Sequence, residues 1–247
     1  MHCALCAEKS LIPKKIINMV HLIILSTLSI ITASFSGYFN IKQNIRLRLL
    51  FKFVASLLFL AVGFFASLQS GTDKRYFLFI FSALMCGLLG DLFLVVKGFF
   101  EDGNRIMFEV FGMASFLLGH ILYIVLFITT AGAFNFAVLA IALSAPLTIC
   151  LLQKFKVFDL GKLFLPATVY CTILALMTAT AVNFFIQINS TPALLAMIAG
   201  ILFFVSDFSL ALRNYNKKIT KTGVSVLVYV VLLTYYTAQV LFGLSIL

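Results

Sequence analysis

Long apolar stretches, separated by short charged segments, are the main feature of this chain. Stretches without Lys, Arg, Asp or Glu run over residues 16–41, 53–72, 110–153, 163–206 and 222–247. A helix needs about 20 residues to cross a bilayer, so each stretch is long enough for a crossing. As single helices, the two stretches of 44 residues would each reach about 66 Å, about twice the thickness of the hydrocarbon core. They must therefore double back, and turn-forming residues stand near both midpoints, at 129–133 and 189–192.

This division predicts eight membrane-spanning helices. They are expected at residues 16–38, 49–69, 76–96, 107–128, 134–153, 163–186, 192–212 and 223–246. A closed β-barrel would also satisfy its backbone in lipid, but its strands alternate apolar and polar residues, whereas these runs are continuously apolar. We therefore predict an all-α membrane protein with eight transmembrane helices in one bundle over residues 16–247. Residues 1–15 are expected to form a short mobile tail.

Composition excludes a water-soluble monomer. Of the 247 residues, 63% are hydrophobic and 11% are charged, against about 25% charged in an ordinary soluble domain. The net charge of +10 does not indicate nucleic-acid binding, because the basic residues lie between apolar spans and not along one polar face. We interpret them as topology signals and as contacts to the headgroups of membrane lipids.

The basic residues also predict how the bundle is oriented. With eight crossings both termini share one face, which carries five basic residues: Lys9, Lys14, Lys15, Lys74 and Arg75. The opposite face carries thirteen: Lys42, Arg46, Arg48, Lys52, Lys97, Arg105, Lys154, Lys156, Lys162, Arg213, Lys217, Lys218 and Lys221. By the positive-inside rule this second face is cytoplasmic and both termini lie outside. In a bacterium the membrane would be the inner, cytoplasmic one.

Two of the eight acidic residues, Asp91 and Asp207, lie inside predicted spans. An acid at the centre of a spanning helix costs about 2.5 to 3.5 kcal/mol on insertion scales, so such residues usually face a cavity and serve a function. Each acid precedes a cation, Lys97 or Arg213, by six residues, in spans that run in the same direction. Both are therefore expected about 9 Å from the cytoplasmic end. The alternative is that each pairs with a nearby cation as a structural contact.

The segments around these acids suggest an internal duplication. Residues 90–97 (GDLFLVVK) align with residues 206–213 (SDFSLALR) at an offset of 116 residues. A duplication of this kind would build the bundle from two parallel four-helix repeats. The alternative is a single bundle without repeats.

Other polar residues in the spans are candidates for the wall of a site. His120 and Tyr123 share one face of the fourth span, and Tyr235 can meet Gln239 one turn further along the last span. Hydrogen bonds between helices explain these residues equally well. Two buried carboxyl groups that are neighbours can supply one protonated and one ionised member, which acid and base catalysis need together.

Metal and serine chemistry have little support. The histidines are only His2, His21 and His120, and Cys3-x-x-Cys6 has no second pair to complete a zinc site. No G-x-S-x-G segment occurs. No metal site is therefore predicted.

Four segments give the chain a resemblance to the YhhN-like lysoplasmalogenase family. They are Gly90-Asp91, Phe116-x-x-Gly119-His120-x-x-Tyr123, Gly200-x-x-x-Phe204-x-Ser206-Asp207-x-x-Leu210-Ala211 and Tyr235-x-x-x-Gln239. The resemblance covers residues 52–245 and fits the eight-helix plan. In one departure, the family often begins its second span with Lys-Pro, whereas Phe53 follows Lys52 here, so the backbone that proline pre-sets at a helix start is absent.

The resemblance implies that the vinyl ether of a lysoplasmalogen, a lysophospholipid, is hydrolysed to a fatty aldehyde and glycerophosphoethanolamine or glycerophosphocholine. The matching positions for the family's catalytic acids are Asp91 and Asp207. We expect the substrate-binding residues to be His120, Tyr123, Lys52, Ser206, Tyr235 and Gln239, with the headgroup phosphate near Lys52, Lys97 or Arg213. A vinyl ether is labile to acid because protonation of its alkene carbon gives an oxygen-stabilised cation, so no metal or organic cofactor is required.

Two other functions stay open at this point. Intramembrane acids also mark ion pathways, so a small proton-coupled transporter is one alternative. A hydrolase of another lysolipid, with an ester or a different ether, is the second. The sequence leaves the headgroup preference, the oligomeric state and the division of labour between the two aspartates undetermined.

Overall fold

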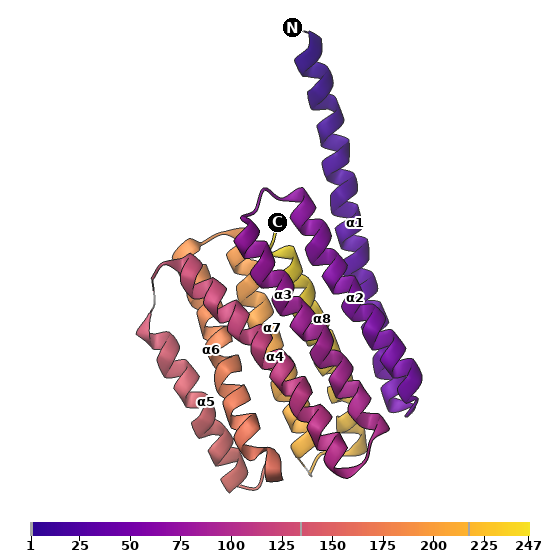
Figure 1. Cartoon of the computed structure of the whole chain (residues 1–247), viewed down its shortest axis with the longest axis vertical. Helices are drawn as coiled ribbons and strands as arrows, with labels where there is room; N and C mark the ends of the chain where they lie inside the picture. Colours follow the sequence, from indigo (N-terminus) through magenta and orange to yellow (C-terminus); the bar gives the residue numbers. More distant parts are fainter. Residues whose placement is uncertain (1, 134, 217) are drawn as a thin grey trace.

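The computed structural model describes the backbone of residues 2–133, 135–216 and 218–247, and the side chains of these residues except 2–18, 102 and 139. Within these ranges the chain forms eight α-helices and two short 3-10 helices, with no strand (Figure 1). The α-helices are α1 (His2–Ile41), α2 (Ile45–Gln69), α3 (Lys74–Val96), α4 (Asp102–Ala131), α5 (Phe136–Lys154), α6 (Phe164–Ile188), α7 (Thr191–Tyr215) and α8 (Lys221–Leu244). The 3-10 helices are η1 (Lys97–Phe99) and η2 (Gly161–Leu163). The side chains of Cys3 and Cys6 lie outside the described residues.

Each of these α-helices is long and apolar enough to cross a membrane, which confirms the predicted architecture. Both long apolar stretches double back where turn residues were expected. The first stretch turns between the end of α4 at Ala131 and the start of α5 at Phe136. The second turns between Ile188 and Thr191. The protein is therefore a multi-pass membrane protein.

Local side-chain chemistry explains where several helices begin and end. Asn44, Ser190 and Thr220 each accept a hydrogen bond from a backbone N–H in the first turn of α2, α7 and α8 respectively. Such caps satisfy N–H groups that have no partner within the helix. Helices α4 and α6 end at Gly132 and Asn189, whose left-handed backbones (φ 69° and 46°) stop the helical path.

Two helix starts differ from the sequence-based expectation. Helix α2 begins at Ile45 and not at residue 49, because Asn44 supplies the N-cap. Lys52 consequently lies about 10 Å inside the helix, at about 1.5 Å per residue. Helix α1 begins at His2, so the backbone of residues 2–15, for which a tail was predicted, continues the helix of the first span.

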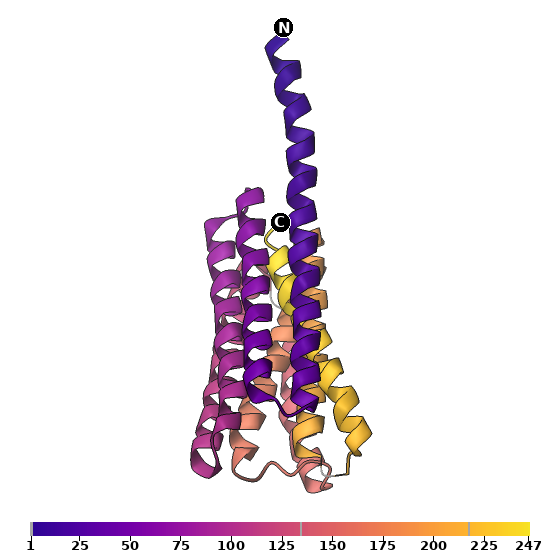
Figure 2. The ribbon, with the colours of Figure 1, turned by 90° about the vertical axis from the view of Figure 1, so that its right-hand side faces the viewer.

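The helices run side by side along one long axis, with α1 at one edge of the bundle and α5 at the other (Figures 1 and 2). Helix α8 packs against α1, α2, α3 and α7, and helix α6 packs against α4, α5 and α7. Both ends of the chain lie at the same end of the bundle, as an even number of crossings requires. The starts of α2 and α8 and the ends of α3 and α7 lie at the opposite end.

The helix neighbours of the two halves correspond. The pairs α1–α2, α2–α3, α3–α4 and α2–α8 match α5–α6, α6–α7, α7–α8 and α6–α4. The contacts of α8 with α1 and α3 have no counterpart among the main helix pairs of the described residues. This pattern favours two four-helix repeats, in which α8 makes additional contacts with helices of the first repeat.

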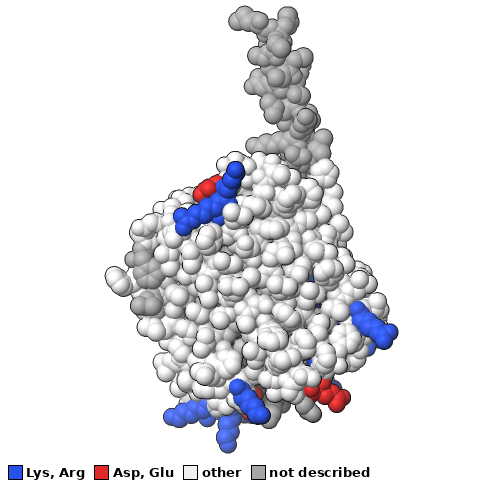
Figure 3. Space-filling view, in the orientation of Figure 1, with Lys and Arg blue, Asp and Glu red and all other residues white. Residues whose placement is uncertain are grey.

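The surface follows the membrane-spanning arrangement. In Figure 3 charged atoms gather toward the two ends of the visible face, and uncharged atoms cover the wide zone between them. Large apolar side chains on several helices are exposed, among them Ile23 of α1, Leu147 of α5 and Val226 of α8. Lipid tails would cover these side chains in a bilayer.

Glycines let α3 approach its neighbours closely around Asp91. A Cβ atom added at Gly90 would lie 2.6 Å from the ring of Phe116 on α4. That ring cannot move aside freely, because its edge contacts with Phe203 and Tyr235 have centroid distances of 6.1 and 5.8 Å. A Cβ at Gly87 would lie 2.3 Å from the amide nitrogen of Gln239 on α8. Because these two positions carry no side chain, α3, which carries Asp91, can pack closely against both α4 and α8.

Gly90→Ala should destabilise the protein, because the added methyl group must displace the enclosed Phe116 ring. Overpacking of this kind costs about 1 to 3 kcal/mol. The measurement is the thermal melting temperature of the detergent-solubilised protein, with Gly103→Ala as the matched control. Gly103 also lies in a helix but has nothing within 4 Å of an added Cβ. Equal melting temperatures for the two variants would contradict the close-approach argument.

Candidate functional site

A cavity of about 490 Å³ lies inside the bundle between α3, α4, α6, α7 and α8, with α5 as an outer wall. Its surface is mostly apolar. Five of the titratable side chains that line it are Lys52, Asp91, Glu109, Tyr170 and Asp207. Its size and apolar character with few polar groups are typical of small-molecule sites.

Asp91 is held by a dense set of partners on α2 and α8. Its Oδ1 atom lies 2.8 Å from Nζ of Lys52. Its Oδ2 atom accepts hydrogen bonds from Ser56 Oγ at 2.7 Å and from Tyr236 OH at 3.0 Å. All four side chains are buried, with Asp91 2% exposed. Three donors therefore converge on this one carboxyl group.

Asp207 has a different environment. Tyr170 of α6 donates a hydrogen bond to its Oδ2 atom, and the Tyr170 hydroxyl lies 3.2 Å from Nε2 of His120. No described cation lies within ion-pair distance of Asp207, since the ion pairs among the described residues involve Asp91 and Glu109. The side-chain partner of Asp207 is thus a neutral hydroxyl group.

The two aspartates therefore line one cavity but have partners of different charge. They come from α3 and α7, which run in the same direction, and both side chains line this cavity. One carboxyl group has a cationic partner and the other has a tyrosine. This arrangement can supply a proton and accept one within the same space.

Lys52 lies inside the bundle, where it pairs with Asp91. We predicted a headgroup contact at the membrane edge, but the Lys52 side chain is 10% exposed and pairs with Asp91. The physical reason is the early start of α2 at Ile45, which carries Lys52 into the bundle. Its position is that of a counter-ion to Asp91, at the wall of the cavity.

Ser206 and Tyr235 also line the cavity, as expected for substrate-binding residues. Ser206 Oγ donates to the carbonyl oxygen of Val231 at 3.1 Å, which joins α7 to α8. Tyr235 OH donates to the carbonyl oxygen of Gly87 at 3.3 Å, and Gln239 Nε2 donates to Tyr235 OH at 2.9 Å. Gln239 thus does not line the cavity and instead orients Tyr235 from behind.

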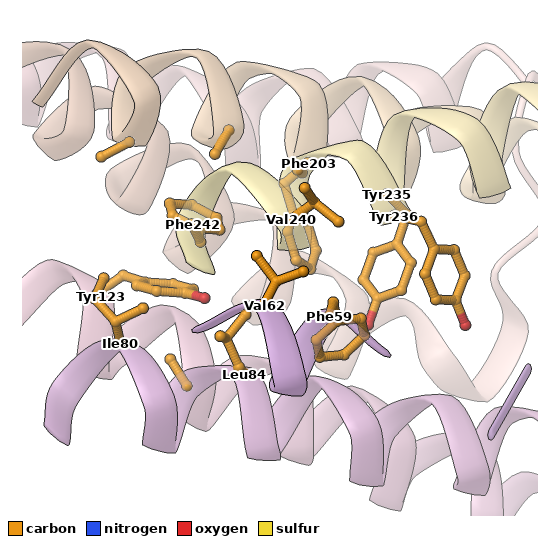
Figure 4. Close-up of a cluster of buried hydrophobic side chains, with 14 of the residues drawn as sticks. Phe59, Val62, Ile80, Leu84, Tyr123, Phe203, Tyr235, Tyr236, Val240 and Phe242 are labelled. Carbon is orange, nitrogen blue, oxygen red and sulfur yellow. The ribbon is translucent and has the colours of Figure 1, made fainter. Parts of the chain in front are cut away.

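His120 and Tyr123 are also absent from the cavity wall. His120 is 1% exposed and is enclosed by Phe203, with ring centroids 4.7 Å apart. It reaches the site only through Tyr170. Tyr123 stacks on Phe242 with centroids 4.0 Å apart and belongs to the core shown in Figure 4, away from the pair Tyr235 and Tyr236. Tyr123 is thus a packing residue of the core in this structure, and its contact with substrate stays a prediction.

Two contacts of the aspartates, Ser56 and Tyr170, were missed in the sequence, and Tyr236 stood among the polar residues of the last span without being chosen for the site. A serine or tyrosine carries no insertion penalty comparable to that of an acid, so these residues do not stand out from other polar residues in the spans. Tyr236 lies next to the chosen Tyr235, and only the rotation of α8 decides which hydroxyl faces Asp91. Tyr170 has no sequence signal that ties it to Asp207.

Lys52→Met should lower the melting temperature strongly, because it leaves the carboxylate of Asp91 buried without its cation. Breaking one partner of a buried pair costs about 3 to 5 kcal/mol. Adding Asp91→Asn to Lys52→Met should recover much of the loss, because the charge is then removed. Lys74→Met, at an exposed lysine, is the control for loss of a lysine. A double variant no more stable than Lys52→Met would exclude the proposed coupling.

Comparison with known proteins supports the resemblance of this sequence to the YhhN-like family. A family model described as the YhhN family matches residues 47–246, about four fifths of the chain. No curated protein and no solved structure gave a match. The matched region begins in the first turn of α2 and includes both cavity aspartates. The chain therefore belongs to the YhhN family, which is the family of lysoplasmalogenases.

Proposed function

We propose that this membrane protein is a lysoplasmalogenase-like hydrolase that cleaves the vinyl ether of a lysoplasmalogen with Asp91 and Asp207 as acid and base. The observation that carries the proposal is the pair of aspartates in one apolar cavity, one held by Lys52 and one without a cation. Family membership supports the same reaction class. Vinyl ethers and glycosides both react through oxygen-stabilised cations, and paired carboxyl groups serve glycoside hydrolysis.

Asp207 is assigned as the proton donor. Its protonated carboxyl group transfers a proton to the alkene carbon that is not bonded to oxygen, and the neighbouring carbon becomes an oxygen-stabilised cation. Asp91, ionised beside Lys52, takes a proton from a water molecule as the water oxygen bonds to that cation. The product of this step is a hemiacetal. General acid and base groups of this kind typically contribute about 10²- to 10⁴-fold each.

Collapse of the hemiacetal restores both carboxyl groups. Asp207, now ionised, takes the proton of the hemiacetal hydroxyl, and the aldehyde carbonyl forms as the bond to the glycerol oxygen breaks. Asp91 returns its proton to that oxygen. One water is consumed, and a fatty aldehyde and a glycerophospho-alcohol leave. The hydrogen bond from Tyr170 orients Asp207 for both transfers.

The apolar part of the cavity suits the single aliphatic chain of the substrate. Leu174, Phe204 and Phe208 are among its lining residues, and α5 closes the outer side with Ile141 and Ile149. Burial of methylene groups there stabilises the bound lipid by about 0.8 kcal/mol for each one removed from water.

Asp91→Asn and Asp207→Asn should each lower kcat by at least about 100-fold, because each removes one of the two proton-transfer groups. The assay measures aldehyde release from an alkenyl lysophospholipid by the detergent-solubilised protein. Asp73→Asn is the matched control, since Asp73 caps α3 at the other end of the bundle and Asn caps helices equally well.

Near-normal aldehyde release by either active-site variant would remove that residue from the mechanism. The saturated alkyl-ether analogue should give no aldehyde, because it has no alkene carbon to protonate. If the wild-type protein releases no aldehyde but moves labelled solute across vesicle membranes, the hydrolase proposal fails and a transporter is favoured.

The orientation of the bundle is proposed from its charges. The end that holds the starts of α2 and α8 carries most of the basic residues between spans, and both termini lie at the other end (Figure 1). The positive-inside rule then places the termini outside the cell and the Arg213 end in the cytoplasm. For a bacterial protein the membrane would be the cytoplasmic one.

Cysteine labelling tests this orientation. In a background with the native cysteines replaced by alanine, Gly71→Cys in the α2–α3 loop should react with a membrane-impermeant maleimide on intact cells. Arg46→Cys, at the opposite end of α2, should react only after the cells are permeabilised. The reverse pattern would show that the termini are cytoplasmic.

A further inference from the structure

A second, smaller cavity adjoins the first at the end of the bundle opposite the termini. It measures about 50 Å³, and its wall includes Arg48, Lys52, Lys97 and Arg213. Arg48 lies in the first turn of α2, and the other end of the cavity is formed by the last turns of α3 and α7. Three helices thus bring four cations to one small space.

Two of these four cations are neutralised within the protein. Lys52 pairs with Asp91 at 2.8 Å, and Lys97 pairs with Glu109 at 3.0 Å. Arg48 and Arg213 have no carboxylate partner among the described side chains. The Nε atom of Arg213 donates to the neighbouring Asn214 side chain at 3.2 Å, which neutralises no charge. The cavity therefore has a surplus of two positive charges.

The two surplus charges, on Arg48 and Arg213, destabilise the folded protein when no anion is bound. Both arginines are partly buried, and both line one cavity of about 50 Å³, so their like charges repel each other. Like charges withdrawn from water raise the free energy of the folded protein unless an anion lies between them. The position of these two arginines is therefore explained best by an anionic ligand.

The small cavity shares part of its wall with the large one. Six residues line both: Lys52, Leu94, Leu210, Asn214, Val231 and Leu232. A ligand that fills both would be apolar over most of its length and anionic at one end. A phosphate group suits the anionic end, because arginine forks form paired hydrogen bonds with phosphate oxygens.

We propose that Arg48 and Arg213 form a clamp for the phosphodiester of a single-chain lysophospholipid, whose chain occupies the large cavity. The clamp deepens the proposed function, on which the identity of the ligand as substrate rests. It replaces Lys52 as the phosphate contact, since Lys52 is already paired with Asp91. Arg48 precedes Lys52 by one helical turn, so it reaches toward the membrane edge where Lys52 cannot.

Binding measured without turnover tests the clamp. The probes are a saturated 1-alkyl lysophosphocholine, which contains no vinyl ether, and 1-alkylglycerol with the same chain but no phosphate. Binding to the full-length protein in an uncharged detergent is followed by isothermal titration calorimetry. The wild-type protein should bind the phosphate-containing lipid at least about tenfold more tightly than the alkylglycerol, as expected when hydrogen bonds to a charged group are added.

Arg48→Gln and Arg213→Gln should each weaken binding of the alkyl lysophosphocholine about tenfold or more and leave binding of 1-alkylglycerol unchanged. Arg48→Lys should fall between Gln and the wild type, because it keeps the charge and loses the fork. Arg46→Gln is the matched control, since Arg46 is an exposed residue in the same turn of α2 and lines neither cavity. Thermal melting checks that every variant is folded.

Several results would overturn the clamp. The two lipids could bind the wild-type protein equally, or Arg48→Gln and Arg213→Gln could behave like Arg46→Gln. Equal affinity for a diacyl phosphocholine would identify the site with bilayer headgroups, and equal affinity for inorganic phosphate would identify a free-anion site. Arginine-dependent binding together with no aldehyde release from the alkenyl lipid would retain the clamp and reject the hydrolase proposal.

Discussion

The ion pair between Lys52 and Asp91 is the interaction on which the rest of the site depends. A carboxylate inside a bundle that spans a membrane is stable only with a partner, because few water molecules are available to solvate it. Helix α2 supplies that partner and Ser56, and helix α8 supplies Tyr236. This bonding fixes α3 against α2, which precedes it in the chain, and against α8, which is distant in the sequence. Gly87 and Gly90 are needed at the same point because the helices must approach closely for these bonds to form.

The asymmetry of the two carboxyl groups follows from this packing. Asp207 lies across the cavity on α7 and receives a hydroxyl group from Tyr170, with His120 behind it. The His120 ring is enclosed by aromatic side chains, so it supports Tyr170 from outside the cavity. Two acids at matching positions of similar helices thus acquire different partners. The same cavity can therefore hold one acid and one base without a metal ion supplying either.

Most of the fold could be predicted from hydrophobicity alone, and so could the pair of aspartates. An acid in an apolar span is costly, and this cost makes Asp91 and Asp207 visible without any knowledge of their neighbours. Tyr170 and Ser56 carry no such cost and could not be selected. Tyr123 shares a helical face with His120, but periodicity gives only the face of a helix and not which neighbour that face meets. Its ring packs on Phe242 in the core.

The sequence by itself determined the number of helices, the turns within the two long apolar stretches and the two carboxyl groups. These depend on local properties, since the bilayer sets the length of a helix and glycine or asparagine sets its end. Only the tertiary structure decided that Lys52 is a counter-ion, that Tyr170 bonds Asp207 and that Arg48 and Arg213 line one cavity. Those outcomes depend on the rotation and depth of helices distant in the sequence, which packing between side chains fixes and which no single span encodes.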